Sequence, residues 1–425
     1  MSRAEFPGLL IIADDLSGAA DCAADFASRI DTHVVLTGNA KDLSGVIAID
    51  ADSRRLDPQQ AADQNRAALQ QQSRTGMALY KKIDSTLRGN VASEVDALQG
   101  LRGMALVAPA FPAMKRTTVQ GVQLIDGVPV DQSDVWRNEN LHGTGNLHGT
   151  GNLLDLFVAQ GLRTQWLGLD TLRDPSRLKT TLRNALEQGV QALVCDAELD
   201  SDLMQLAQAS VAWHDELFWV GSAGLARHLP HAFELAEVLP IKVEPRSPVL
   251  TVVGSMSRHS QAQADRLAQA SKPLCLTLQP ATLLNEDAHA ERAAAYLQLQ
   301  EHLATGRDVL VRLDQQQRDP AQAAMLSNAL AQWLTPALPH AGSVVATGGE
   351  TARAILIAAG IKRLTLFGEL ATGVVLAEAR LGKHTLNVVT KAGGFGNSDT
   401  LLTAWQMLHA PAATGTPFNE EASYV

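Results

Sequence analysis

Several features are scarce or missing in this 425-residue chain, and their absence excludes whole classes of protein. The three cysteines, Cys22, Cys195 and Cys275, lie far apart, so they offer neither a disulfide framework nor the spacing of a metal site. No apolar run approaches the roughly 18 residues that a membrane-spanning helix needs. The net charge is −10, which argues against broad binding to nucleic acids or anionic membranes. We therefore expect a cytoplasmic protein with no nucleic-acid partner and no membrane partner.

Hydrophobic residues, by contrast, make up 46% of the chain, which is enough to build sizeable cores. Short apolar runs alternate with segments of helical spacing, the pattern of a mostly parallel sheet flanked by helices. Prolines interrupt the stretch from 239 to 248, which has little helical pattern and is typical of a linker. We predict two α/β domains, residues 1–240 and residues 241–425.

The first apolar run, residues 9–12, predicts a buried strand that ends next to Asp14 and Asp15. A segment with helical spacing follows, from Ala19 to Arg29. In open α/β sheets, ligands bind at the carboxyl ends of strands, where loops lead into helices. One aspartate can cap the helix, but two carboxylates need only one cap. The second is a candidate base, metal ligand or hydroxyl acceptor.

Two later predicted strands end in similar groups of polar residues. Residues 46–49 lead to Asp52-Ser53-Arg54, and residues 77–82 lead to a segment that contains Lys82, Asp84, Ser85, Thr86 and Arg88. Arginine binds a carboxylate through two parallel hydrogen bonds, and serine, threonine and aspartate can bind hydroxyl groups. A single arginine in such a place is more often a solvated or salt-bridged surface residue. Recurrence at successive strand ends favours a site for a small hydroxylated acid.

Three units in the second half each contain a strand, a glycine-rich loop and a helix. Their loops contain Gly254 and Ser255, then Gly348, Gly349, Glu350 and Thr351, then Lys391, Gly393 and Gly394. Glycines let the backbone approach a phosphate closely, and helix N-termini point free N–H groups at it. None of the loops has the spacing of a P-loop or a dinucleotide fingerprint, and a lone Gly-Gly turn is usually only a tight turn. Three of them in one domain favour a nucleotide or phosphate site.

An exact tandem repeat occupies residues 141–152, where Leu-His-Gly-Thr-Gly-Asn occurs twice. Its glycines and asparagines predict a loop. His142 and His148 raise the alternative of a metal site, but a recent duplication in a tolerant surface loop explains an exact copy better.

Together these motifs resemble, in order and content, those of the four-carbon acid sugar kinases, a family once catalogued as a domain of unknown function. The resemblance covers nearly the whole chain and is carried by residues 13–19, 52–54, 82–90, 108–112, 116–118, 127–130, 254–255, 347–351 and 391–396. It implies an N-terminal domain that binds the sugar acid, a C-terminal domain that binds ATP, and an active site in the cleft between them. The implied reaction transfers the γ-phosphoryl group to the terminal (4-) hydroxyl of a tetronate such as D-threonate or D-erythronate.

The resemblance also implies roles for individual residues. The acid would be held by Asp14, Arg54, Lys82, Asp84, Ser85, Thr86 and Arg88. The nucleotide would be held by Ser255, Gly348, Gly349, Glu350, Thr351, Lys391, Gly393 and Gly394. The base that orients or deprotonates the hydroxyl stays open among Asp14, Asp15 and Asp84. We expect ATP and Mg²⁺ as cofactors, with no assigned metal ligands, and leave a homodimer open.

The segment from Lys82 to Gly89 is similar to the threonate and erythronate branch of the family. Met114 and Lys115 depart from the small residues expected before Arg116, and the tandem repeat replaces a different stretch of the relatives. A kinase for 3-oxo-tetronate or a related acid is therefore an alternative. Alternatives from other classes are a metal-dependent phosphohydrolase, which would release phosphate without ATP, and a non-catalytic sugar-acid sensor.

Overall fold

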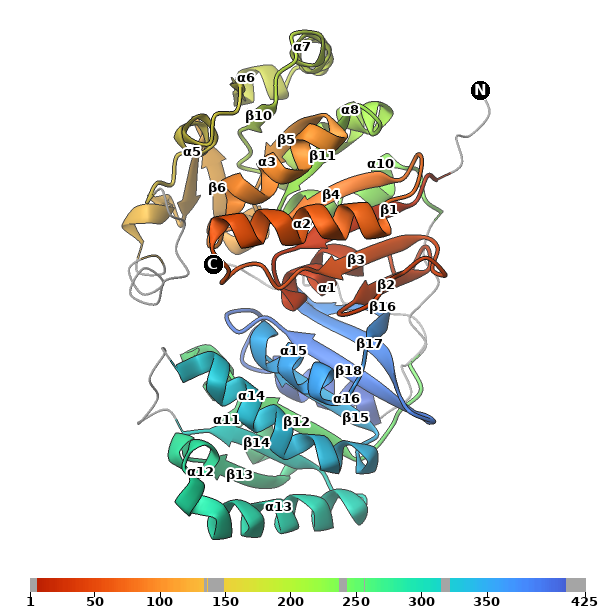
Figure 1. The fold of residues 1–425 in the computed structure, drawn as a ribbon, viewed down its shortest axis with the longest axis vertical. Coiled ribbons are helices and arrows are strands. Elements are labelled where there is room, and N and C mark those ends of the chain that lie inside the picture. The colour runs from red at the N-terminus through yellow and green to blue at the C-terminus, as the bar shows by residue number, and fades with distance from the viewer. Residues whose placement is uncertain are drawn as a thin grey trace. The chain divides into compact units, whose positions relative to one another are not determined.

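The structure, a computed structural model, describes residues 6–133, 136, 149–236, 243–255, 257–314 and 322–409. The chain divides into two compact units, Met1–Glu237 and Val238–Val425. In each unit, helices flank a sheet whose strands are mostly parallel (Figure 1). This confirms the predicted α/β class with two domains. The predicted boundary between residues 240 and 241 and most of the tandem repeat lie outside the described residues.

The sheet of the N-terminal unit is entirely parallel, in the order β2-β3-β1-β4-β11-β5-β10-β9. Its strands are β1 (Leu9–Ala13), β2 (Thr32–Val35), β3 (Val46–Asp50), β4 (Ala78–Lys82), β5 (Met104–Ala108), β9 (Thr164–Leu167), β10 (Ala192–Cys195) and β11 (Leu217–Gly221). The strands β1, β3 and β4 are buried along their whole length, as expected for parallel strands covered on both faces.

The described helices of this unit are α1 (Leu16–Ala24), α2 (Pro58–Gln72), α3 (Val91–Arg102), α5 (Leu153–Ala159), α6 (Leu169–Leu172), α7 (Pro175–Glu187), α8 (Asp200–Ser210), α9 (Ala223–Ala226) and α10 (Leu229–Ala232). Helices α2 and α3 pack against each other beside the sheet (Figure 1). The sequence placed the first helix from Ala19 to Arg29, and this was wrong at both ends. Asp15 caps α1 from Leu16, and after Ala24 the chain continues in turns whose N–H groups bond three residues back.

A small antiparallel sheet, which the sequence did not predict, completes the N-terminal unit. Its strands are β6 (Arg116–Val119), β7 (Val122–Ile125) and β8 (Val128–Pro129). The turn between β6 and β7 places both Gln120 and Gly121 at positive φ. Asp196 accepts hydrogen bonds from both backbone N–H groups of this turn, at 2.8 and 2.9 Å, and fixes its position.

The sheet of the C-terminal unit has the order β13-β14-β12-β15-β18-β17-β16. Strands β13 (Leu274–Leu278), β14 (Val309–Leu313), β12 (Val249–Val253), β15 (Ser343–Thr347) and β18 (His384–Lys391) are parallel. Strands β17 (Val374–Leu381) and β16 (Arg363–Ala371) continue the sheet in antiparallel fashion. The described helices are α11 (Arg258–Ser271), α12 (Pro280–Leu284), α13 (His289–Ala304), α14 (Ala323–Leu334), α15 (Gly349–Ala358) and α16 (Thr400–His409).

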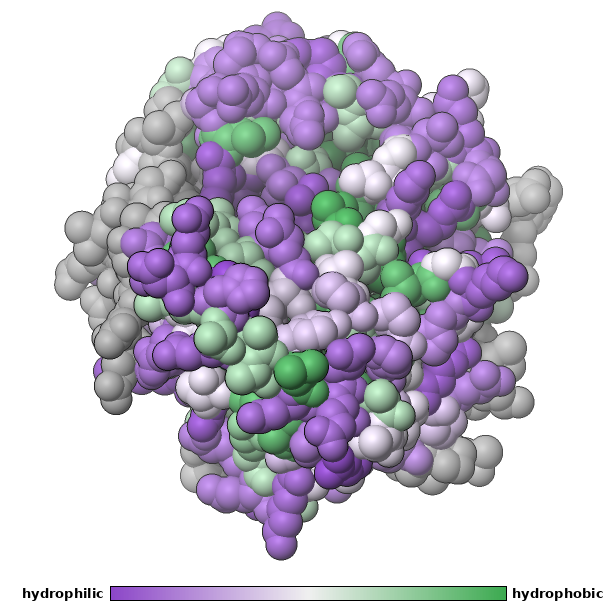
Figure 2. Space-filling view, turned by 60° about the horizontal axis from the view of Figure 1, so that its bottom comes forward, coloured by the Kyte–Doolittle hydropathy of each residue, from purple (hydrophilic) through white to green (hydrophobic). Residues whose placement is uncertain are grey.

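Among the described residues visible in Figure 2, hydrophilic ones dominate the surface and hydrophobic ones form small groups. Within the described ranges, no helix is both long enough and apolar enough to cross a membrane.

Candidate active site

The three polar strand ends of the N-terminal unit belong to neighbouring strands. β1 lies between β3 and β4, and all three run in the same direction, so their carboxyl ends share one edge of the sheet. The loop after β3 brings Arg54 to the two aspartates that follow β1. Its Nε donates to Asp14 Oδ2 at 2.6 Å, and its Nη1 and Nη2 donate to the two oxygens of Asp15 at 3.0 and 2.9 Å. The structure thus brings together residues that the sequence placed 40 positions apart.

Asp15 serves two purposes in this arrangement. Its Oδ1 accepts the backbone N–H of Gly18 at 3.0 Å and caps α1, while both of its oxygens bind Arg54. Asp15 is thus the aspartate that caps the helix, and the same side chain is also tied to Arg54; its part in ligand binding stays a prediction.

Asp84, in the loop after β4, is held between two guanidinium groups. Arg88 donates to its Oδ2 through Nε at 3.0 Å and through Nη2, and Arg54 Nη2 lies 3.6 Å from the same oxygen. The backbone N–H of Thr86 donates to Oδ1 at 2.7 Å, and the hydroxyl of Thr86 donates there as well. Burial alone would raise the pKa of Asp84, but Arg88 and Arg54 outweigh it and hold that pKa well below its usual range.

Asp14 is buried and is also stabilised in its charged form. Burial would raise its pKa, yet the charges of Arg54 and Lys82 exceed that effect and lower it. Both carboxylates are therefore ionised at neutral pH. They hold the arginines in fixed positions from which guanidinium donors can bind an acid.

Lys82, the last residue of β4, is only 5% exposed. Its ammonium lies against α1, because a Cβ at Gly18 would come within 2.5 Å of Lys82 Nζ. Glycine is required at position 18 for this close approach. Within the described ranges the side chain of Lys82 makes no hydrogen bond or ion pair, so its ammonium retains donors for a ligand.

Beneath these residues lies a buried polar group that the sequence analysis missed. Lys81 Nζ is 2.8 Å from Glu94 Oε2, and the two side chains are 0 and 1% exposed. Ser53 donates to Glu94 Oε1 at 2.6 Å, and Asn65 donates to Ser53 at 3.2 Å. This network fixes the residue that precedes Arg54. One signal in the sequence was the Lys81-Lys82 pair, since neighbouring residues of a strand point to opposite faces.

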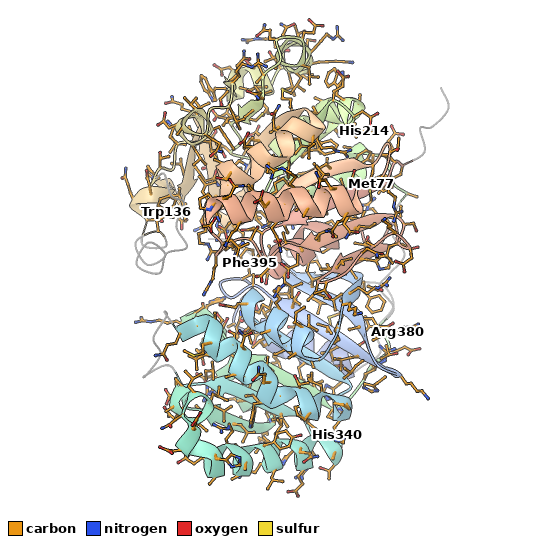
Figure 3. The ribbon with its side chains drawn as sticks, viewed as in Figure 1. Met77, Trp136, His214, His340, Arg380 and Phe395 are labelled. Carbon is orange, nitrogen blue, oxygen red and sulfur yellow. The ribbon has the colours of Figure 1, made fainter. Side chains whose placement is uncertain are left out.

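The small antiparallel sheet holds the loop after β4 from another side. Arg116 donates to the hydroxyl of Ser85, and Gln123 donates to the Ser85 carbonyl at 2.8 Å. Trp136, labelled in Figure 3, donates from its indole N–H to the carbonyl of Thr86 at 2.7 Å. Ser85 and Thr86 are therefore fixed by long-range contacts that no local motif could reveal.

In the C-terminal unit the three glycine loops also follow neighbouring strands, β12, β15 and β18. A Cβ at Gly393 would lie 2.4 Å from Ser255 Oγ, and one at Gly254 would lie 2.0 Å from Thr351 Oγ1. A Cβ at Gly348 would be 3.7 Å from Ser255. The loops thus converge on Ser255 and Thr351, and at Gly254 and Gly393 they do so at distances that leave no room for a Cβ.

The N-terminus of α15 opens into this group of loops. Gly348 is its N-cap with a φ of 88°, and no side chain caps it. Gly348 donates its own N–H to the carbonyl of Lys391 at 2.8 Å, which ties the β15 loop to β18. The next N–H groups of the ten-residue helix form a natural anion site, with Glu350 half-buried in the first turn. No atom lies within 4 Å of a Cβ built at Gly394, so this position faces open space.

Helix α11 secures the loop that contains Gly393. Ser260 donates to the Gly393 carbonyl at 2.7 Å, and Gln263 donates to the Asn397 carbonyl at 2.6 Å. The buried ammonium of Lys391 donates to Ser260 Oγ at 3.3 Å and to the carbonyls of Ala392 and Gly393 at 3.0 and 3.3 Å. Phe395, labelled in Figure 3, belongs to the same loop. Lys391 therefore supports the loop backbone, and its predicted contact with a phosphate stays a prediction.

Across the described part of the chain, no group of three or more His, Cys, Asp or Glu residues could hold a metal ion. His142 and His148, the alternative metal ligands of the tandem repeat, lie outside that part.

Comparison with known protein families divides the chain in the same way as the fold does. Residues 9–229 match the model of a sugar-binding N-terminal domain, and residues 250–401 match that of a nucleotide-binding C-terminal domain.

Individual relatives are similar over nearly the full length. A D-threonate kinase of Cupriavidus necator is 44% identical over 95% of this chain and 99% of its own. A D-threonate kinase of Salmonella typhimurium is 28% identical over 93% of this chain and 97% of its own. The crystal structure of a Salmonella typhimurium protein, 22% identical, shares the fold with a TM-score of 0.78 over 94% of this chain and 98% of that one. The chain belongs to the four-carbon acid sugar kinase family and is a carbohydrate-acid kinase.

Proposed function

We propose that this protein transfers the γ-phosphoryl group of ATP to the 4-hydroxyl group of D-threonate. The observation that carries the proposal is the cluster of Asp14, Arg54 and Asp84 at the carboxyl edge of one sheet, in a chain 44% identical to a D-threonate kinase. The cluster offers planar cations for a carboxylate and fixed carboxylates for hydroxyl groups, which matches a small hydroxylated acid.

In the N-terminal unit, Arg54 or Arg88 would bind the carboxylate of the acid. Asp14, Asp84, Ser85 and Thr86 would bind its hydroxyl groups, with Lys82 as a further donor. These side chains are held by hydrogen bonds before the ligand arrives, so binding requires little reorganisation. The division of roles within this set follows from chemistry: guanidinium groups only donate hydrogen bonds, whereas ionised carboxylates only accept them.

In the C-terminal unit, the ATP phosphates would lie against the free N–H groups of α15 and of the loop at Gly393 and Gly394. Ser255 and Thr351 would add hydroxyl contacts, with Gly348 and Gly349 shaping the helix entry. Mg²⁺ is usually bound through one or two protein carboxylates together with the nucleotide phosphates. Glu350, half-buried in the first turn of α15, is the carboxylate we assign to this task. The ion would neutralise charge on the phosphate oxygens.

Phosphoryl transfer depends mainly on positioning and on neutralising charge, because its loose transition state makes few demands on covalent chemistry. The fixed arginines align the acid, and the backbone N–H groups of the glycine loops hold the phosphates. The groups that would bind the acid and the groups that would bind the phosphates are thus in position before either substrate arrives.

A coupled assay of ADP release tests the proposal. The panel contains D-threonate, D-erythronate, L-threonate, 3-oxo-tetronate and a blank without acceptor. We expect the highest kcat/KM with D-threonate and a 4-phosphate as product. A preference for D-erythronate or 3-oxo-tetronate would reassign the substrate within the family. Phosphate release from a phosphorylated acid without ATP would point to a phosphohydrolase, and binding without turnover would point to a sensor.

A pair of variants locates the acid site. Arg54→Ala should lower kcat/KM for the acid at least about 100-fold, since it removes the bonds to two carboxylates and a ligand donor. Arg66→Ala is the matched control, because the side chain of Arg66 is 41% exposed and, among the described residues, pairs only with Asp63 on the surface of α2. Equal losses in both variants would contradict the assignment.

A further inference from the structure

Three buried polar atoms in the segment from residue 14 to residue 21 have no hydrogen-bond partner in the structure. They are Asp14 Oδ1, Ser17 Oγ and Asp21 Oδ1. All three side chains are at least nine-tenths buried. Most buried polar atoms in proteins find a partner, because an unsatisfied one costs about 1–3 kcal/mol. Three of them in eight residues indicate a place where a polar ligand supplies the missing partners.

Helix geometry puts Asp21 beside the acid site. Ser17 and Asp21 are four residues apart on α1, and Gly18 and Asp21 are three apart, so all three share one face of the helix. The ammonium of Lys82 lies against that face at Gly18. Asp21 is therefore one helical turn from a buried cation that has donors available.

The other carboxylates of the site are poorly suited to accept a proton. Asp84 and Asp14 hold arginines, and their pKa values are lowered by those charges. Asp15 uses both oxygens for Arg54 and one of them also for the cap of α1. A base works best when its pKa is near the working pH and a lone pair is free.

Asp21 has both properties. Burial raises the pKa of Asp21 to about 6. The positive charges of Lys82 and Arg227 oppose this rise, and the nearby carboxylates of Asp25 and Asp15 add to it. The carboxylate is thus mostly ionised at pH 7 but far more basic than Asp14 or Asp84.

We propose that Asp21 is the catalytic base of the reaction, an inference that rests on the proposed function. Its Oδ1 accepts the proton of the attacking hydroxyl group, while Lys82 donates a hydrogen bond to the oxygen that loses it. The O–H bond breaks as the oxygen forms a bond to the γ-phosphorus. The bond from that phosphorus to the bridging oxygen breaks, and ADP leaves with the electron pair. Asp21 then returns the proton to solvent.

Asp14 has a different task in this scheme. Its Oδ2 is bound to Arg54, and its Oδ1 is free to accept a hydrogen bond from a hydroxyl group of the acid. Asp14 orients the acid, and Asp21 receives the proton.

The experiment measures kcat, the KM values for acid and ATP, and sugar-acid affinity by calorimetry for Asp21→Asn, Asp14→Asn and Asp25→Asn. Asp21→Asn should lower kcat about 10²- to 10⁴-fold and leave acid affinity within about threefold. Asp14→Asn should weaken acid binding. Asp25→Asn, at the C-cap of α1, is the control: it should retain kcat within about threefold at pH 8 and only move the acid limb of the pH profile to lower pH, because it removes a carboxylate that raises the pKa of Asp21.

The pH profile of kcat in the unmodified enzyme provides a test that needs no folded variant. We expect kcat to fall tenfold per pH unit below about pH 6, and this limb should disappear in the residual activity of Asp21→Asn. A flat profile from pH 5 to 8, or kcat in Asp21→Asn within threefold of the unmodified enzyme, would overturn the proposal. An enzyme inactive on every tetronate would instead contradict the proposed function.

Discussion

Removing the carboxylate of Glu94 should destabilise the N-terminal unit severely, although Glu94 is not among the residues that we propose to bind a ligand. Glu94→Ala deletes the partner of Lys81, 2.8 Å away, and the acceptor of the Ser53 hydroxyl, 2.6 Å away. Loss of one member of a fully buried ion pair costs about 3–5 kcal/mol, because the remaining charge is left without compensation. An unsatisfied buried hydroxyl adds about 1 kcal/mol. The sum of about 4–6 kcal/mol corresponds to a lower Tm by on the order of 10–20 °C in a unit of this size.

Urea unfolding of Glu94→Ala, followed by tryptophan fluorescence, measures this cost. The exposed pair of Arg66 and Asp63, 41 and 58% exposed, is the matched comparison, and Asp63→Ala should cost less than about 1 kcal/mol. A double variant, Lys81→Met with Glu94→Leu, should recover most of the loss, since neither charge then remains buried.

Two results would refute this reasoning. One is a cost below about 1 kcal/mol for Glu94→Ala, which would mean that Lys81 finds water or another partner. The other is a double variant as unstable as the single one, which would mean that packing rather than charge determines the loss. The network also holds the residue before Arg54, so Glu94→Gln should raise the KM for the acid more than the KM for ATP.

Further predictions concern the glycine loops and Arg54. In Gly393→Ala the new Cβ would lie 2.4 Å from Ser255 Oγ, so this variant should raise the KM for ATP at least about tenfold without changing the KM for the acid. The control is Gly100→Ala, whose Cβ would meet open space on α3 and which should change neither KM. Burial lowers the pKa of Lys391 to about 8 from 10.5, so the unfolded chain binds more protons between these pH values, and the free energy of unfolding should rise with pH there. Urea midpoints at pH 7.5, 9 and 10 should show this rise, and Lys391→Met should reduce it. Arg54→Lys retains the charge but loses the planar fork, and should lower kcat/KM for the acid at least about tenfold while the KM for ATP stays constant.

The polar strand ends were the part of the site that the sequence could predict. Apolar runs identify β1, β3 and β4, and the loops after them carry the polar residues that the structure brings together. The carboxyl ends of parallel strands share one edge of a sheet, but the sequence alone did not show that these three strands are neighbours. The roles of the individual residues in ligand binding stay proposals.

Other features of the candidate site and of the sheets could not be predicted, because they depend on contacts between residues that are distant in the sequence. Arg116 reaches Ser85 across 31 positions, and Glu94 reaches Ser53 across 41. Strand β17 was missed because its first four residues are all buried and show no alternation, and its pairing with β18 is what places it in the sheet. Strand β16 does alternate between buried and more exposed residues, so its sequence carried a usable signal. The ammonium of Lys391, at the end of β18, is directed to its own loop by Ser260, a residue of α11.

The two lysines that end β4 limit the changes in length that this strand tolerates. Lys81 and Lys82 are neighbours, yet one neutralises a carboxylate in the interior and the other lies against α1. Inserting or deleting a single residue in Ala78–Lys82 would exchange their sides and leave an unmatched charge in each place. Variation in length should therefore be confined to the loops, and replacing either lysine by a shorter cation should not be rescued by its neighbour.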